Sequence, residues 1–164
     1  MLRLALLLSA ATLAGMTPQA LLTTLLKTRI PNAALPSGFS SPRAEKQALT
    51  ANARKYHAVG LVDVALKGPD AEDAFAWIVF PNHADAIGDL DNPVVGNGVQ
   101  VVNTVPGIKE SLILTGSLNG KKVTDAAAVA GNVLVQGVVT SSKVRLPTAI
   151  ILLHAAIAHL QKVR

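Results

Sequence analysis

Residues 56–80 read YHAVGLVDVALKGPDAEDAFAWIVF, and this stretch decides the fold. In Tyr56–Lys67, apolar side chains fill both alternating sets of positions, a pattern typical of a strand that is covered on both faces. Gly68-Pro69-Asp70 is a strong turn signal, and the aromatic and β-branched composition of Ala74–Phe80 is typical of a returning strand. The stretch therefore predicts an antiparallel hairpin, which Pro81 ends.

The residues after this hairpin predict a short helix and then further strands. Asn82 is a favourable N-cap for a helix through Leu90, and Asp91-Asn92-Pro93 breaks that helix. Two more strands are expected over Val99–Val105, which follows the turn at Gly96-Asn97-Gly98, and over Ser111–Leu118, which Asn119-Gly120 closes.

The alanine-rich segment 123–137 is compatible with either a helix or a hairpin. Its alanines favour a helix, whereas Gly131-Asn132 between two apolar runs is the signal of a two-residue hairpin turn. We favour the hairpin, with strands over Val123–Ala130 and Val133–Thr140.

The C-terminus carries the clearest helix pattern of the chain. Pro147 suits a first helical position, and Thr148–Val163 follows with an apolar face made of Ile150, Leu153, Ile157 and Leu160. The other side is also apolar, through Ile151, Leu152, Ala155, Ala156 and Ala158. This helix is therefore expected either to be sandwiched or to mediate self-association of the domain, as a homodimer or with a protein partner.

Together these elements predict an α+β fold for residues 56–164 as a single domain. We expect a two-layer antiparallel sheet of about five to six strands, with a short helix after the first hairpin and a long C-terminal helix packed on one face. Residues 21–55 form an irregular or helical N-terminal arm, with a short apolar helix near Leu21–Leu26 and a second helix over Ala44–Lys55.

Residues 1–20 have the pattern of a signal peptide. Arg3 precedes an eleven-residue apolar run, Leu4–Ala14, whose length suits a signal better than a membrane span. The favoured location is therefore exported, either periplasmic or secreted. The alternatives are an uncleaved anchor over Leu4–Leu26, which would be the route to membrane association, and a buried N-terminal helix.

Composition excludes several classes of protein. Half of the 164 residues are hydrophobic, so the chain can form a core and is not intrinsically disordered. The lack of cysteine excludes disulfides, cysteine zinc sites and thiol nucleophiles. The net charge is +5, yet residues 57–92 hold seven acids and one base, and the remaining bases occur singly or in pairs. We therefore expect no nucleic-acid partner.

The strongest candidates for chemistry are His83 and Asp85 at the start of the predicted short helix. Asp89 would share a helical face with Asp85, and an active-site group often follows a strand in this way. The simpler interpretation is an exposed acidic helix face. His154 and His159 are five residues apart and diverge around a helix, so no metal site and no cofactor are expected.

Aromatic side chains make up only 3% of the chain, and they gather on the first hairpin. Phe75, Trp77 and Phe80 are expected either to form the bulky half of an alanine- and valine-rich core or to line a ligand pocket.

These features favour an exported, non-catalytic α+β domain that self-associates or binds a partner and has room for a small apolar ligand. The alternative is a small dimeric α+β enzyme that acts on a hydrophobic substrate, with His83 or Asp85 in proton transfer.

Overall fold

The structure is a computed structural model that describes residues 16–68, 72–94 and 98–164. Within these residues, one antiparallel sheet has seven strands in the order β1-β2-β3-β7-β6-β5-β4. The strands are β1 (Glu45–Gln47), β2 (Gly60–Lys67), β3 (Glu72–Val79), β4 (Gln100–Asn103), β5 (Ser111–Leu118), β6 (Lys121–Ala130) and β7 (Val133–Ser141). The helices are α1 (Pro18–Lys27), α2 (Ala51–Lys55), α3 (His83–Asp91) and α4 (Leu146–Val163), and a 3-10 turn spans Asn32–Ala34. The predicted α+β class is confirmed, with seven strands in place of five or six.

The two hairpins that were predicted at the centre of the sheet are both present. β2 pairs with β3 from Gly60 opposite Val79 to Lys67 opposite Glu72, and β6 pairs with β7 around Gly131. Gly131 has a φ of 63°, the left-handed conformation that a tight turn requires. The alanine-rich segment is therefore strand, because its hairpin pairing and burial outweigh the helix propensity of alanine.

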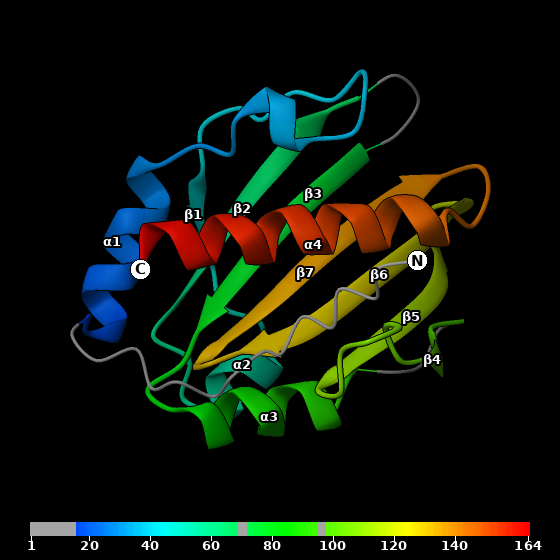
Figure 1. The fold of residues 1–164 in the computed structure, drawn as a ribbon. Helices are drawn as coiled ribbons and strands as arrows, with labels where there is room; N and C mark the ends of the chain where they lie inside the picture. Colours follow the sequence, from blue (N-terminus) through cyan, green and yellow to red (C-terminus); the bar gives the residue numbers. More distant parts are fainter. Residues whose placement is uncertain (1–15, 69–71, 95–97) are drawn as a thin grey trace.

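α4 crosses one face of the sheet, which we call the core face (Figure 1). Val62, Phe75, Trp77 and Val135 point from the strands into this layer and are at most 1% exposed. Gly137 on β7 allows α4 to approach closely, since a Cβ there would lie 2.6 Å from both the Ala149 carbonyl oxygen and the Leu153 nitrogen. The core face is thus a tightly packed layer.

α2 and α3 pack on the opposite face of the sheet, at one end of the strands (Figure 1). We call this the groove face. Ile78, Phe80 and Leu134 are buried under these helices together with Ala86 and Leu90 of α3. Short helices cannot cover the whole sheet, so the layer is incomplete.

This arrangement corrects two sequence predictions about which faces of the sheet are packed against helices. The predicted two-layer packing becomes helices on both faces, because the even-numbered apolar residues of β3 and β7 also need burial. β2, predicted to be covered on both faces, buries Val62 and Val64 on the core face but leaves Ala65 exposed and Leu61 partly exposed on the groove face.

The helix predicted over Ala44–Lys55 forms only over Ala51–Lys55. Its first part forms β1, which pairs with β2, with Glu45 opposite Asp63. Helix begins only at Ala51, where the Thr50 hydroxyl accepts a hydrogen bond from the Ala53 N–H at 3.1 Å. Pairing to the free edge of β2 therefore outweighs local helix propensity in the first part, and the N-cap sets the start of α2.

The apolar outer side that was expected for α4 is smaller in the structure. Leu152 and Ala156 are fully buried, and α1 packs beside the C-terminal half of α4, which leaves Ile151 as its exposed large apolar residue, at 51%. Self-association therefore stays a prediction. α4 is also the one helix of the described residues that is long and apolar enough to cross a membrane, although here it lies against the sheet.

The predicted signal peptide lies largely outside the described residues. α1 begins at Pro18, with the Thr17 hydroxyl as N-cap, and its Leu21, Leu22 and Leu25 are at most 3% exposed. The C-terminal part of the Leu4–Leu26 segment thus belongs to the core of the domain. The turn residues 69–71 and 95–97 also lie outside the described part.

Candidate functional site

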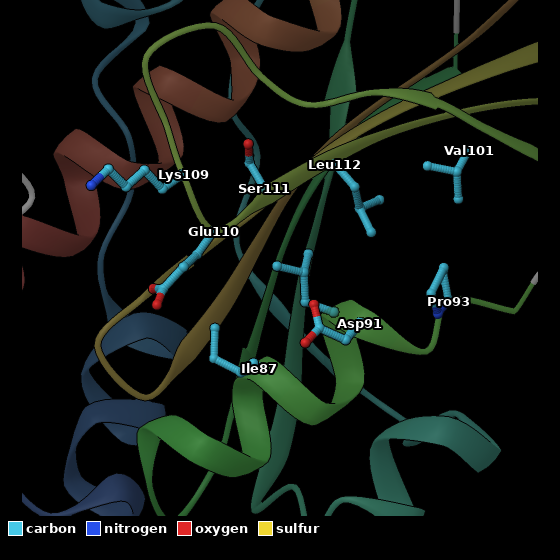
Figure 2. Close-up of a pocket in the computed structure, with 9 residues that line it drawn as sticks. Ile87, Asp91, Pro93, Val101, Lys109, Glu110, Ser111 and Leu112 are labelled. Carbon is cyan, nitrogen blue, oxygen red and sulfur yellow. The ribbon is translucent and has the colours of Figure 1, made fainter.

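Two adjoining cavities open on the groove face between α3 and the strands, and together we call them the α3 groove. The outer cavity has a volume of about 350 Å³ and is bordered by α3, β4 and the start of β5 (Figure 2). The inner cavity has a volume of about 230 Å³ and reaches over β5, β6 and β7. Leu90, Pro93 and Leu112 line both cavities. The combined space is in the range that small-molecule sites occupy.

The wall formed by α3 is held at both ends by asparagine side chains. At its start, Asn82 accepts a hydrogen bond from the Asp85 N–H at 2.9 Å. At its end, the Asn52 amide from α2 donates to the Asp89 carboxylate and to the Asn92 carbonyl at 3.0 Å. These contacts join α2 to the C-terminal end of α3, so the two helices form one wall of the groove.

The floor of the inner cavity is apolar except for Asp125 and Gln136. The Gln136 amide donates to Asp125 Oδ2 at 2.9 Å across the β6–β7 pair. Asp125 Oδ1 is buried and has no hydrogen-bond partner within the described residues. Burial raises the pKa of Asp125 to about 7, an effect that the hydrogen bond from Gln136 only partly offsets.

Carboxylates dominate the charge of the α3 groove. Asp89 is only 6% exposed, and burial raises its pKa, although the Asn52 hydrogen bond opposes that shift. Asp91 and Glu110 line the outer cavity with a single base, Lys109. Lys109 and Glu110 extend to one side, away from Pro93 and Val101 (Figure 2). The arrangement can therefore bind a ligand that is apolar over most of its surface and donates hydrogen bonds at one end.

His83 and Asp85, the candidates for proton transfer, have different partners in the structure. His83 contacts the Gly131 carbonyl through Nδ1 at 2.6 Å and Glu110 through Nε2 at 3.1 Å. Both contacts raise the pKa of His83, and the contact with Gly131 has the larger effect. Asp85 accepts from the Asn82 amide at 2.7 Å and lies 3.5 Å from His57 Nδ1. Neither residue lines the α3 groove, and each has partners of its own.

The three aromatic residues, expected either to form the bulky half of the core or to line a pocket, do not meet at one site. Phe75 and Trp77 lie on the core face, with ring centroids 6.0 Å apart, and the Trp77 indole N–H donates to the Ala156 carbonyl at 3.3 Å. Phe80 is buried on the groove face under α3. All three are at most 1% exposed, and none lines either cavity.

The functional candidates that sequence reasoning missed are Asp125, Gln136 and Asn52. Gln136 donates to Asp125, which is 11 residues away in the chain, and Asn52 donates to Asp89, which is 37 residues away. Folding brings both pairs together. The one available signal was Asp125 itself, a lone carboxylate ahead of an alanine run in a predicted strand. In the described part of the chain, no group of three or more histidine, aspartate or glutamate side chains is placed to hold a metal ion.

The fold is shared with a solved bacterial structure. Neither protein-family models nor curated protein sequences match this chain. It is similar to the crystal structure of the extracellular domain of PknH from Mycobacterium tuberculosis, with a TM-score of 0.58 and 10% identity over 80% of this chain and 94% of that chain. At this identity the likeness shows the fold alone.

Proposed function

We propose that this chain is an exported, non-catalytic domain that holds a small, largely apolar ligand in the α3 groove. The observation that carries the proposal is Asp125, which lines the inner cavity with Leu112, Leu114 and Leu134 and whose buried Oδ1 has no hydrogen-bond partner within the described residues. A buried carboxylate oxygen without a donor is costly, and a ligand that supplies the donor would remove that cost.

The apolar rim of the groove supports the same proposal. Val94 and Val101 line the cavities and are 75% and 50% exposed, so a bound ligand would bury them. Removal of this apolar surface from water would contribute to affinity.

Export is supported by two independent features. Residues 4–14 have the length and composition of a signal segment, and the similar solved structure is an extracellular domain. Cleavage after Ala14 would leave α1 intact, whereas cleavage after Ala20 would remove the first residues of a helix that packs in the core. Intact-mass measurement of protein recovered from host cells distinguishes these two sites from an uncleaved anchor.

The alternative of an enzyme with His83 or Asp85 in proton transfer receives less support. Neither side chain reaches the α3 groove, and both are engaged with neighbouring groups. The groove also lacks a second titratable group paired with Asp125 at hydrogen-bond distance within the described residues.

A groove-filling substitution tests the binding proposal. Nile red, a neutral apolar dye, is titrated with the full chain, and saturable emission is expected for the unmodified protein. Leu114→Trp places a large ring in the inner cavity and is expected to abolish this saturation. Leu118→Trp is the matched control, because Leu118 lies on the same side of the same strand, 61% exposed and outside the groove. Equal binding by both variants would count against the proposal.

A further inference from the structure

The α3 groove carries a charge opposite to that of the whole chain. The net charge is +5, yet the groove is lined by Asp89, Asp91, Glu110 and Asp125 with only Lys109 as a base. Glu110 contacts His83 Nε2 at 3.1 Å, and Lys109 extends away from the Pro93 side of the cavity (Figure 2). A concave site lined mainly by carboxylates attracts cations.

The C-terminal end of α3 strengthens this negative potential. Its last turn holds Asp89 and Asp91 and no basic residue. Unsatisfied carbonyl groups give a helix C-terminus partial negative charge, so acids there are unfavourable to the helix itself. Of these two helix-end carboxylates, Asp89 lines the inner cavity together with Asp125, and Asp91 lines the outer cavity.

Asp125 is the group to which a cation would bind. Gln136 occupies its Oδ2 and leaves the buried Oδ1 without a donor. An ammonium group supplies several N–H donors together with a compensating charge, which suits a buried carboxylate better than a neutral hydroxyl does. Ile78, Leu112 and Leu134 around it suit an aliphatic body.

We infer that the ligand of the α3 groove is an organic ammonium ion with an aliphatic body, with its ammonium group against the Asp125 carboxylate. This inference rests on the function proposed above, since it names the chemical class of the ligand for the same groove. A neutral aliphatic molecule and a bare divalent cation are the competing occupants.

Three probes with the same aliphatic chain test the inference: octylammonium, octanol and octanoate. Each is titrated calorimetrically into the full chain at pH 8. We expect octylammonium to bind at least about tenfold more tightly than octanol, because charge-assisted hydrogen bonds exceed neutral ones, and octanoate to bind most weakly.

Asp125→Asn is expected to remove the preference for octylammonium over octanol. Asp63→Asn is the matched control, because Asp63 lies on the same face of the sheet but outside both cavities. The control is expected to keep the preference within about twofold, because Asp63 lies outside both cavities and solvent screens charges at a distance.

A pH series supplies a second readout. As pH falls from 8 to 6, protonation of Asp125 is expected to weaken octylammonium binding and leave octanol binding unchanged. The charged groups that line the same groove are Asp89, Asp91, Glu110 and Lys109, so the Asp125→Asn variant is measured in parallel to isolate the contribution of Asp125.

Distinct results would overturn the inference and the proposed function. Octanol binding as tightly as octylammonium, with Leu114→Trp still abolishing both, would overturn the ammonium inference and keep an apolar-ligand function. Calcium binding that displaces octylammonium and disappears in Asp125→Asn would also overturn it, in favour of a metal ion. No saturable binding of any of the three probes, together with equal Nile red signals for Leu114→Trp and Leu118→Trp, would reject the proposed function itself.

Discussion

The two faces of the sheet differ in how completely helices cover them. On the core face, α4 approaches so closely that Gly137 has no room for a side chain, and the large residues such as Trp77 are fully buried. On the groove face, α2 and α3 cover only one end, and the carboxylates of Asp89 and Asp125 are drawn into the partly covered region. Buried carboxylates oppose folding on either face. Asp73 of β3 is 2% exposed on the core-face side, whereas Asp89 and Asp125 line the α3 groove.

A substitution in the core face provides the largest expected effect. Trp77→Ala removes a fully buried ring and its hydrogen bond to Ala156, and should lower the free energy of unfolding by about 3–5 kcal/mol. Val101→Ala on the groove side is the control and should change it by less than about 0.5 kcal/mol. Urea denaturation measures both values. A loss below about 1 kcal/mol for Trp77→Ala would mean that the core face is not the stabilising layer.

On the groove face, the substitution Asp125→Asn is expected to raise the free energy of unfolding at pH 8. Asp125 has a pKa raised by burial from 3.8 to about 7, so the folded state binds its proton more tightly than the unfolded state does. Its ionisation therefore lowers the stability of the fold as pH rises from about 4 to about 7, by roughly 2–4 kcal/mol. Asp125→Asn should be more stable than the unmodified chain at pH 8, and this difference should shrink towards pH 4.

Urea denaturation between pH 4 and pH 8 measures that difference. Glu72→Gln, on an exposed ion pair with Lys121, serves as control and should leave the slope of stability against pH unchanged. A variant less stable than the parent at pH 8 would show that the Asp125 carboxylate stabilises the fold, and the contrast between the two faces would fail.

Removing the Asn52 contacts that join α2 to α3 should lower the stability of the fold by an intermediate amount. Asn52→Ala leaves the Asp89 carboxylate and the Asn92 carbonyl without their donor, which should cost about 1–3 kcal/mol. Asn82→Gly changes the other end of α3 and keeps this link, and as a cap substitution it should cost a few tenths of a kcal/mol. Thermal unfolding compares them, and equal losses would show that the Asn52 contacts contribute no more than a helix cap.

The smallest effect is expected for His83 and Asp85 together. The double variant His83→Gln, Asp85→Asn should change the dissociation constant of octylammonium by less than about twofold, because neither residue lines the α3 groove. The raised pKa of His83 means that its contacts stabilise the fold at pH below its ordinary value of 6.5, and that this contribution is lost as pH rises through the folded pKa. Abolished binding in the double variant would return these residues to the functional site.

Strand and helix positions were largely accessible from local sequence patterns. β5 has the predicted bounds, and the Gly131-Asn132 turn and the Asn82 cap are present as expected. The helix prediction failed over residues 44–50, where β1 instead pairs with the edge of β2. The candidate site was not predicted, because Asp125 meets Gln136 and the wall of α3 only through strand pairing and helix packing.

By itself, the sequence determined the alternation of elements, the absence of cysteine chemistry and the division of charge between segments. Those properties depend on residues that are neighbours in the chain or on composition. Only the tertiary structure decided which face of the sheet each helix covers, and therefore which carboxylates become buried. Both faces of β3 and β7 carry apolar residues, so the local pattern cannot choose between them. That choice follows from packing, where Gly137 admits α4 on one face and the short α2 and α3 leave a groove on the other.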